Sequence, residues 1–80
     1  MDPHFDKELD ARGLLCPLPI LKTRFAMDDM AAGEVLKVLS TDAGSVRDME
    51  AFARQTETEL LSSTASGGEY VFFLRKGLSP

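Results

Sequence analysis

Residues 7–30, KELDARGLLCPLPILKTRFAMDDM, place a strand, a break and a helix in direct succession. Polar and apolar residues alternate over Lys7–Ala11, with Leu9 and Ala11 on one face, which is typical of a half-buried strand. Gly13 then interrupts the alternation. We therefore predict that the chain leaves a sheet after Ala11 and enters a helix within a few residues.

The helix is predicted to begin at the cysteine. Proline is tolerated in the first helical turn, because the amides there have no acceptor within the helix. We therefore place Cys16 near the N-cap and Pro17 at the first helical position, and expect the helix to run to about Met30. Apolar or small residues then recur at helical spacing, which predicts one buried stripe, formed by Ile20, Thr23, Met27 and Met30.

The rest of the chain supplies three more strands and a second helix. Gly33 is placed to close the first helix. Ser45 is a suitable N-cap for the second helix, with Asp48 three residues later as a shortened capping box. Glycines between the last two strands suit a tight hairpin turn. The predicted elements are a strand over Glu34–Ser40, a helix from Ser45 to about Thr56, and strands over Leu60–Ala65 and Glu69–Lys76, joined across Ser66-Gly67-Gly68.

The predicted order is βαβαββ, an α+β fold. Strands that alternate with helices and end in a hairpin imply a mixed four-stranded sheet with two helices on one face. We expect a two-layer α/β sandwich whose other sheet face stays partly open.

Composition excludes several function classes. The 80 residues are 44% hydrophobic and 28% charged, with a net charge of −4, which argues against direct binding to nucleic acid. No apolar run is long enough to cross a bilayer, and the first residues lack the features of a signal peptide. A single cysteine rules out an internal disulfide and a four-thiolate zinc site, and it suits a reducing cytoplasm. His4 stands alone and is not expected to hold a metal.

Cys16 is the one candidate nucleophile. A helix N-terminus favours the reactive thiolate through the aligned peptide dipoles and free amides. Arg12 and Lys22 could add positive potential, and Pro17 and Pro19 would stiffen the backbone beneath the sulfur. The alternative is a buried structural cysteine, since free cysteine is among the most buried residue types.

Residues 9–22, LDARGLLCPLPILK, closely resemble the opening of the TusA/SirA family of small sulfur-carrier proteins. The family motif, Cys-Pro-x-Pro at the start of the first helix, is matched by Cys16, Pro17 and Pro19, with Arg12, Gly13 and Lys22 in the supporting block. The resemblance continues through Gly33-Glu34, Thr41-Asp42, residues 45–48 and residues 75–77. The resemblance covers nearly the whole chain after residue 7. The length of 80 residues predicts one domain over residues 1–80, with tails at 1–6 and 77–80.

The resemblance also implies a function. Cys16 would accept sulfane sulfur as a persulfide from a cysteine desulfurase or a rhodanese-type donor, and pass it to an acceptor protein. The acceptor could serve tRNA thiolation, molybdenum-cofactor assembly or sulfur oxidation. No cofactor is expected, and we expect a cytoplasmic monomer. Two other classes stay open: a non-catalytic regulatory interaction module, and a redox-sensing thiol protein.

Two positions depart from the common family pattern and bear on the choice of partner. Leu15 stands where many members carry a polar or basic residue, and Asp42-Ala43 replaces a frequent Asp-Pro.

Two further groups of residues have competing explanations. Leu18, Leu21 and Phe25 form a second apolar face on the first helix, suited either to docking a partner or to ordinary edge packing. Asp10, Asp42 and Asp48 could form a carboxylate cluster, but a helix cap and two loop ends explain them better.

Overall fold

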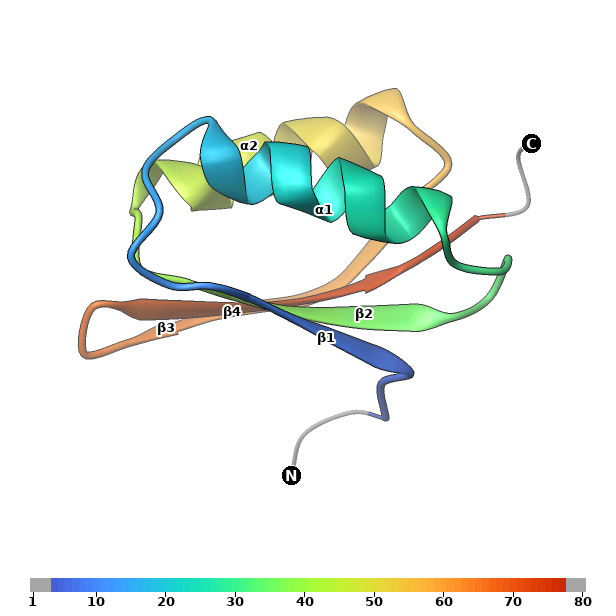
Figure 1. Cartoon of the computed structure of the whole chain (residues 1–80), viewed down its shortest axis with the longest axis horizontal. Coiled ribbons are helices and arrows are strands. Elements are labelled where there is room, and N and C mark those ends of the chain that lie inside the picture. Colours follow the sequence, from blue (N-terminus) through green and yellow to red (C-terminus); the bar gives the residue numbers. More distant parts are fainter. Residues whose placement is uncertain (1–3, 78–80) are drawn as a thin grey trace.

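A computed structural model describes residues 4–77. Two helices lie side by side over one face of a four-stranded sheet (Figure 1). The order of elements along the chain confirms the predicted α+β sandwich. They are β1 (Lys7–Ala11), α1 (Leu18–Asp28), β2 (Val35–Ser40), α2 (Gly44–Gln55), β3 (Glu59–Ser66) and β4 (Glu69–Arg75).

The sheet has the strand order β1-β2-β4-β3, with β1 parallel to β2 and the other pairs antiparallel. The β3–β4 hairpin turns through Gly67 and Gly68, both with positive φ, as the glycine pair predicts. In the parallel pair, Ala11 lies opposite Ser40, so both strands end at the same edge of the sheet. The segments that follow β1 and β2 therefore emerge next to each other.

The core lies between the helices and the sheet. Phe72 and Leu74 of β4 and Leu36 and Val38 of β2 are fully buried there, and Met49 of α2 packs against them. Thr23 and Met27 of α1 are buried as the predicted stripe requires, while Ile20 is partly buried. The core therefore joins both helices to the two central strands.

The first helix is shorter than predicted at both ends. Pro17 is its N-cap, and α1 begins at Leu18 because the backbone first closes a separate turn, in which the Leu18 amide donates to the Leu15 carbonyl at 2.9 Å. At the other end α1 stops at Asp28, and Gly33 (φ +88°) belongs to the loop beyond it. Cys16 therefore lies one residue before the N-cap, close to it as predicted, and Pro17 is the N-cap instead of the first helical residue.

The predicted capping box on the second helix is wrong. Ala43 is the N-cap of α2, with no side-chain cap hydrogen bond. The Ser45 hydroxyl donates instead to the Asp42 carbonyl at 2.6 Å, and the Asp48 side chain accepts a hydrogen bond from outside the helix. Asp48 therefore does not cap α2.

The predicted tails lie partly outside the described residues, which exclude 1–3 and 78–80. Within the N-terminal one, the Asp6 amide donates to the Val35 carbonyl at 2.8 Å, and its carboxylate accepts from the Val35 amide. Phe5 contacts Phe73 on the sheet face that the helices leave uncovered. Contacts with the sheet therefore begin before Lys7. Neither helix described here has the length and apolarity needed to cross a bilayer.

Candidate functional site

The parallel pair β1–β2 brings Cys16 next to the start of α2. The loop after β1 and the loop after β2 leave the same sheet edge and are joined by hydrogen bonds. The Gly13 amide donates to the Thr41 hydroxyl, and the Cys16 amide donates to Oδ2 of Asp42, both at 2.8 Å. Carboxyl ends of parallel strands are common places for functional residues, because loops from separate strands meet there.

Cys16 is exposed, so the alternative of a buried structural cysteine is wrong. Its Sγ–H donates a hydrogen bond to Oδ2 of Asp48, one turn into α2, at 3.0 Å. The thiol is held between the turn that precedes α1 and the first turns of α2. The Cys16–Pro17 peptide bond is cis.

Two carboxylates control the protonation of this thiol. The hydrogen bond to Asp48 raises the pKa of Cys16 above its ordinary value, and loss of solvent and the charges of Asp48 and Asp42 act in the same direction. The prediction that the site favours the thiolate is therefore wrong for the isolated chain. A thiol that donates to a carboxylate is stabilised in its protonated form.

Arg12 does not supply the positive potential predicted for it. Its guanidinium binds the Asp10 carboxylate through Nε at 2.9 Å and through a terminal nitrogen at 3.0 Å. These bonds lower the pKa of Asp10 to about 2. Arg12 also lies 3.9 Å from Glu69, and Lys22 is exposed on α1. The pair formed by Arg12 and Asp10 fixes the loop instead of activating the sulfur.

The two motif prolines have different surroundings. Pro17 is exposed and caps α1, whereas Pro19 is buried, and its carbonyl accepts a hydrogen bond from the Thr23 hydroxyl at 2.8 Å. Gly13 has φ +82°, a conformation that side chains rarely adopt, so glycine permits the turn that leads to Cys16. These three residues shape the backbone on either side of the sulfur.

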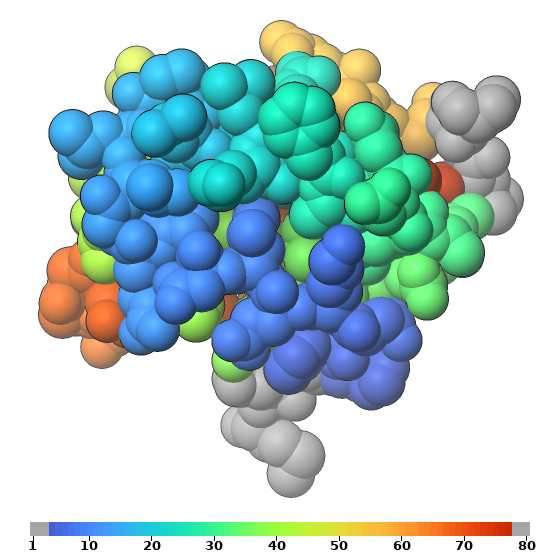
Figure 2. Space-filling view, viewed as in Figure 1, coloured from blue at the N-terminus to red at the C-terminus, as the bar shows by residue number. Residues whose placement is uncertain are grey.

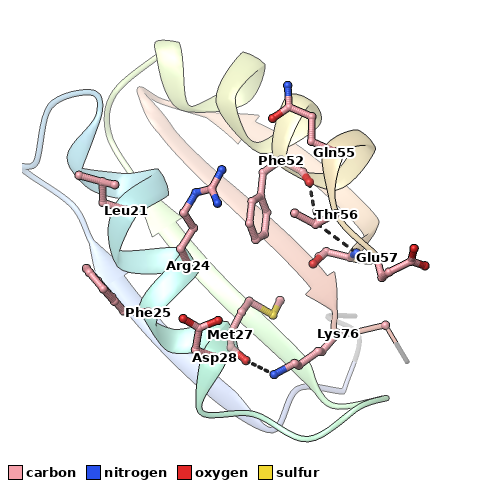
Figure 3. A pocket seen from close by; sticks show the side chains of 12 residues that line it. Leu21, Arg24, Phe25, Met27, Asp28, Phe52, Gln55, Thr56, Glu57 and Lys76 are labelled. Atoms are coloured by element: carbon pink, nitrogen blue, oxygen red, sulfur yellow. Dashed lines mark hydrogen bonds between the residues drawn. The ribbon is translucent and has the colours of Figure 1, made fainter. Parts of the chain in front are cut away.

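Cys16 stands at one end of a groove between the two helices. The part around the sulfur is also lined by Pro17, Ile20 and Asp48. It shares Leu21, Arg24, Phe52 and Gln55 with a larger part of about 540 Å³ that reaches Lys76. In Figure 3 the Arg24 side chain extends from α1 toward Phe52 of α2, and its guanidinium carbon lies 5.2 Å from the centre of that ring.

Several apolar side chains on α1 are exposed, and two of them, Leu21 and Phe25, also line this groove. Phe25 is 70% exposed, Leu18 45% and Leu21 41%, and Leu15 in the preceding turn is 71% exposed. Figure 2 shows α1 at the surface of the molecule, with no other segment over it. Phe25 and Leu15 are largely exposed, whereas Leu18 and Leu21 are more than half covered. These four residues are here called the apolar patch.

Asp48 and Asp42 were missed as site residues. From the sequence, Asp48 is predicted to cap a helix and Asp42 to end a loop. Asp42 is a loop residue that also holds the Cys16 amide, whereas Asp48 contacts the sulfur itself. The available signal was the parallel pairing of the first two strands, which places both loops at one edge.

No cluster suited to a metal ion occurs among the residues from 4 to 77. His4, the only histidine in the sequence, pairs with Asp6 at 3.1 Å.

Replacing Asp48 should make Cys16 more reactive toward a neutral alkylating reagent. Asp48→Asn removes the acceptor charge that raises the pKa of Cys16, so the pKa falls and the thiolate fraction at pH 7.5 rises. We expect alkylation by iodoacetamide to be severalfold faster, because the thiolate is the form of the cysteine that reacts. The rate measured from pH 6 to 10 gives the pKa directly.

Asp29→Asn is the matched control, because it removes the same charge from an exposed residue at the end of α1. An unchanged or raised pKa of Cys16 in Asp48→Asn would contradict the assigned hydrogen bond.

Known proteins resemble this chain over most of the residues given. A family model described as sulfurtransferase TusA matches residues 7–76. The chain is 51% identical over 72 residues to the sulfur carrier protein TusA of Allochromatium vinosum, which covers 90% of this chain and 95% of that protein. It is 52% identical over 69 residues to the putative sulfur carrier protein YrkF of Bacillus subtilis, covering 86% of this chain but only 37% of YrkF.

A solved structure shows the same fold. The SirA-like protein from Desulfitobacterium hafniense superposes with a TM-score of 0.71 at 24% identity, covering 90% of this chain and 99% of that one. The match to the family model and the identity over nearly the whole length lead to one assignment: this chain belongs to the TusA/SirA family, of which the Allochromatium vinosum relative is named a sulfur carrier protein.

Proposed function

We propose that this protein is a sulfur carrier that holds sulfane sulfur as a persulfide on Cys16. The observation that carries the proposal is the exposed Sγ of the one cysteine in the chain, presented on a turn at the end of a groove. Membership of the TusA/SirA family supports the same role. A single thiol is sufficient for a relay, whereas thioredoxin-like exchange needs a second one.

Transfer of sulfane sulfur from a donor persulfide to Cys16 requires neither an oxidant nor a reductant. Sγ of Cys16, as thiolate, attacks the outer sulfur of a donor persulfide, and a new S–S bond forms. The donor's own S–S bond breaks, its inner sulfur leaves with the electron pair, and the proton released from Cys16 ends on that sulfur. In delivery an acceptor nucleophile attacks the outer sulfur, and Cys16 is the leaving group. A thiol and a persulfide have then exchanged one sulfur atom.

The partners proposed are a cysteine desulfurase or a rhodanese-type protein as donor, and a downstream protein as acceptor. The acceptor could belong to tRNA thiolation, molybdenum-cofactor assembly or sulfur oxidation. We propose a monomeric, cytoplasmic carrier that works as one domain over the whole chain. Transfer between two proteins also explains why the reactive sulfur stands at the surface of so small a molecule.

Intact mass measurement tests the proposal and separates it from the two other classes. After incubation with a cysteine desulfurase and cysteine, the protein should gain one sulfur atom that a reducing agent removes. Protein whose Cys16 has been blocked with iodoacetamide is the control and should gain nothing. A gain of oxygen or glutathione under mild oxidant, without any gain of sulfur from either donor class, would identify a redox sensor. No gain of any kind would leave an interaction module.

The apolar patch is proposed as the docking surface for the sulfur-donor protein. Its members Leu15, Leu18, Leu21 and Phe25 are all exposed, and Leu21 also lines the groove that contains Cys16. Exposed apolar residues that gather on one face of a small protein are typical of a contact surface for another protein. A donor that covers them would bring its persulfide toward the same end of the groove.

Phe25→Ala should slow sulfur loading from a protein donor at subsaturating donor concentration. Truncation of a large aromatic residue at a protein interface often costs more than 1 kcal/mol of binding, so we expect about a five- to tenfold lower rate. Alkylation of Cys16 by iodoacetamide should not change, because Phe25 does not contact the sulfur and is 70% exposed. Glu50→Ala on the exposed side of α2 is the control for a surface change away from the patch. Equal loading rates for Phe25→Ala and wild type would contradict docking at this patch.

A further inference from the structure

The two carboxylates at Cys16 carry charge that no basic side chain neutralises. Among the ion pairs found in residues 4–77, none joins Asp42 or Asp48 to a lysine or arginine. Asp48 accepts the Sγ–H of Cys16 at 3.0 Å, and Asp42 accepts the backbone amide of the same residue at 2.8 Å. A molecule that approaches the sulfur therefore enters the field of two negative groups.

The basic residues nearest in the chain and in the groove are engaged elsewhere. Arg12 is bound by Asp10 through two nitrogens. Arg24 lines the same part of the groove as Cys16, but its guanidinium lies over the Phe52 ring. Arg47 precedes Asp48 in the chain and Lys22 lies on α1, and both are exposed. No ion pair found in the part of the chain that the structure describes joins any of these four basic residues to Asp48, so a partner can supply the cation that pairs with it.

We propose that Asp48, aided by Asp42, makes Cys16 selective for partners that bring a positively charged side chain next to their reactive sulfur. Small anionic thiols, disulfides and persulfides are repelled by the same two groups. Asp48 is thus a specificity-determining residue of the site, in addition to its effect on the thiol. A donor loop or an acceptor loop with lysine or arginine beside its cysteine has the matching chemistry.

A cation at Asp48 would also change the state of the sulfur. When a lysine or arginine of the partner pairs with Asp48, the carboxylate becomes a weaker acceptor for Sγ–H and its repulsion of a thiolate falls. The proton then leaves Cys16, the Sγ–S bond forms, and the electron pair of the broken S–S bond goes to the donor sulfur, which takes up a proton. This step rests on the proposed function, whereas the charge selectivity of Cys16 does not.

Two thiol reagents that differ in charge test the selectivity without any partner protein. Methanethiosulfonate ethylammonium is cationic and methanethiosulfonate ethylsulfonate is anionic, and both transfer their thioethyl group to a thiol, with methanesulfinate as the leaving group. The rate of the cationic reagent with Cys16 is divided by the rate of the anionic reagent. This ratio is then divided by the same ratio for 2-mercaptoethanol, a neutral thiol, which removes the intrinsic difference between the two reagents. At low salt we expect the cationic reagent to be favoured about thirtyfold, because attraction against repulsion in water gives about tenfold for a unit charge at about 6–7 Å, as for Asp48, and about threefold at about 11–12 Å, as for Asp42.

Asp48→Asn should lower this normalised ratio to about threefold, and Asp29→Asn should leave it within error of wild type. Raising the salt to about 0.5 M should lower the wild-type ratio as well, because exposed charges are screened. A wild-type ratio near one, or an equal fall in both variants, would overturn the proposal.

A carrier that fails to load sulfur but keeps the charge ratio would refute the proposed function and leave the selectivity standing. Efficient sulfur loading together with a rate ratio near one would refute the charge selectivity and leave the proposed function standing. Both carboxylate variants can be checked for folding by thermal unfolding, since neither Asp29 nor Asp48 belongs to the buried core.

Discussion

Cys16→Ser is expected to abolish sulfur uptake from every donor. Serine keeps a hydroxyl that can donate to Asp48, so the local hydrogen bond survives. An alkoxide cannot accept and release sulfane sulfur as a thiolate does, and the chain has no second cysteine to replace Cys16. The measurement is the intact mass after incubation with donor and cysteine, together with sulfide released by a reducing agent.

The variant must be shown to fold, which its thermal unfolding midpoint would establish. Because Cys16 is exposed, we expect its stability to match that of wild type within about 0.5 kcal/mol. Reducible sulfur on folded Cys16→Ser, at a level near that of wild type, would contradict the assigned role of Cys16.

Phe72→Ala is expected to lower the free energy of unfolding by about 3–5 kcal/mol, since it removes a buried ring and leaves a cavity. Phe72 is fully buried in the central strand β4, where it packs in the cluster that joins both helices to the sheet. A domain of this length has roughly 4–12 kcal/mol of total stability, so the loss would remove a large share of it. Urea titration at 25 °C, monitored by circular dichroism, measures the free energy of unfolding of the variant and of wild type.

Phe25→Ala is the matched control because the chemical change is identical and the ring is 70% exposed. Its loss should be below about 1 kcal/mol. Similar losses for the two variants would contradict the placement of the core between the helices and the sheet.

The fold could be predicted because its elements have strong local signals. Alternation in the strands, helical spacing of the buried stripe and the Gly67-Gly68 turn predicted the order βαβαββ, and the pairing of the sheet confirms it. The ends of the helices were less well predicted. Proline at position 17 is compatible with both a first helical residue and an N-cap, and the hydrogen bond from Leu18 to Leu15 decides for the N-cap.

The site could be predicted only in part, because it depends on a contact between residues that lie far apart in the sequence. The sequence indicated Cys16 because a lone cysteine before two prolines is visible locally. Asp48 lies 32 residues away, and its approach to the sulfur depends on the pairing of β1 with β2 and on the start of α2. The same contact reverses the predicted effect on the thiol, because local reasoning counted the helix dipole and Arg12 but not the facing carboxylate.

Transfer of sulfur from the loaded protein to an acceptor protein tests the carrier role of Cys16 most directly. The protein is loaded by a cysteine desulfurase with ³⁵S-labelled cysteine, separated from donor and free cysteine, and mixed with a sulfur-acceptor protein in the absence of reductant. If Cys16 carries exchangeable sulfane sulfur, the label should leave the carrier and appear on the acceptor at close to one sulfur atom per loaded chain. Label that stays on the carrier, or that reaches only the solution as free sulfide with every acceptor tried, would contradict it.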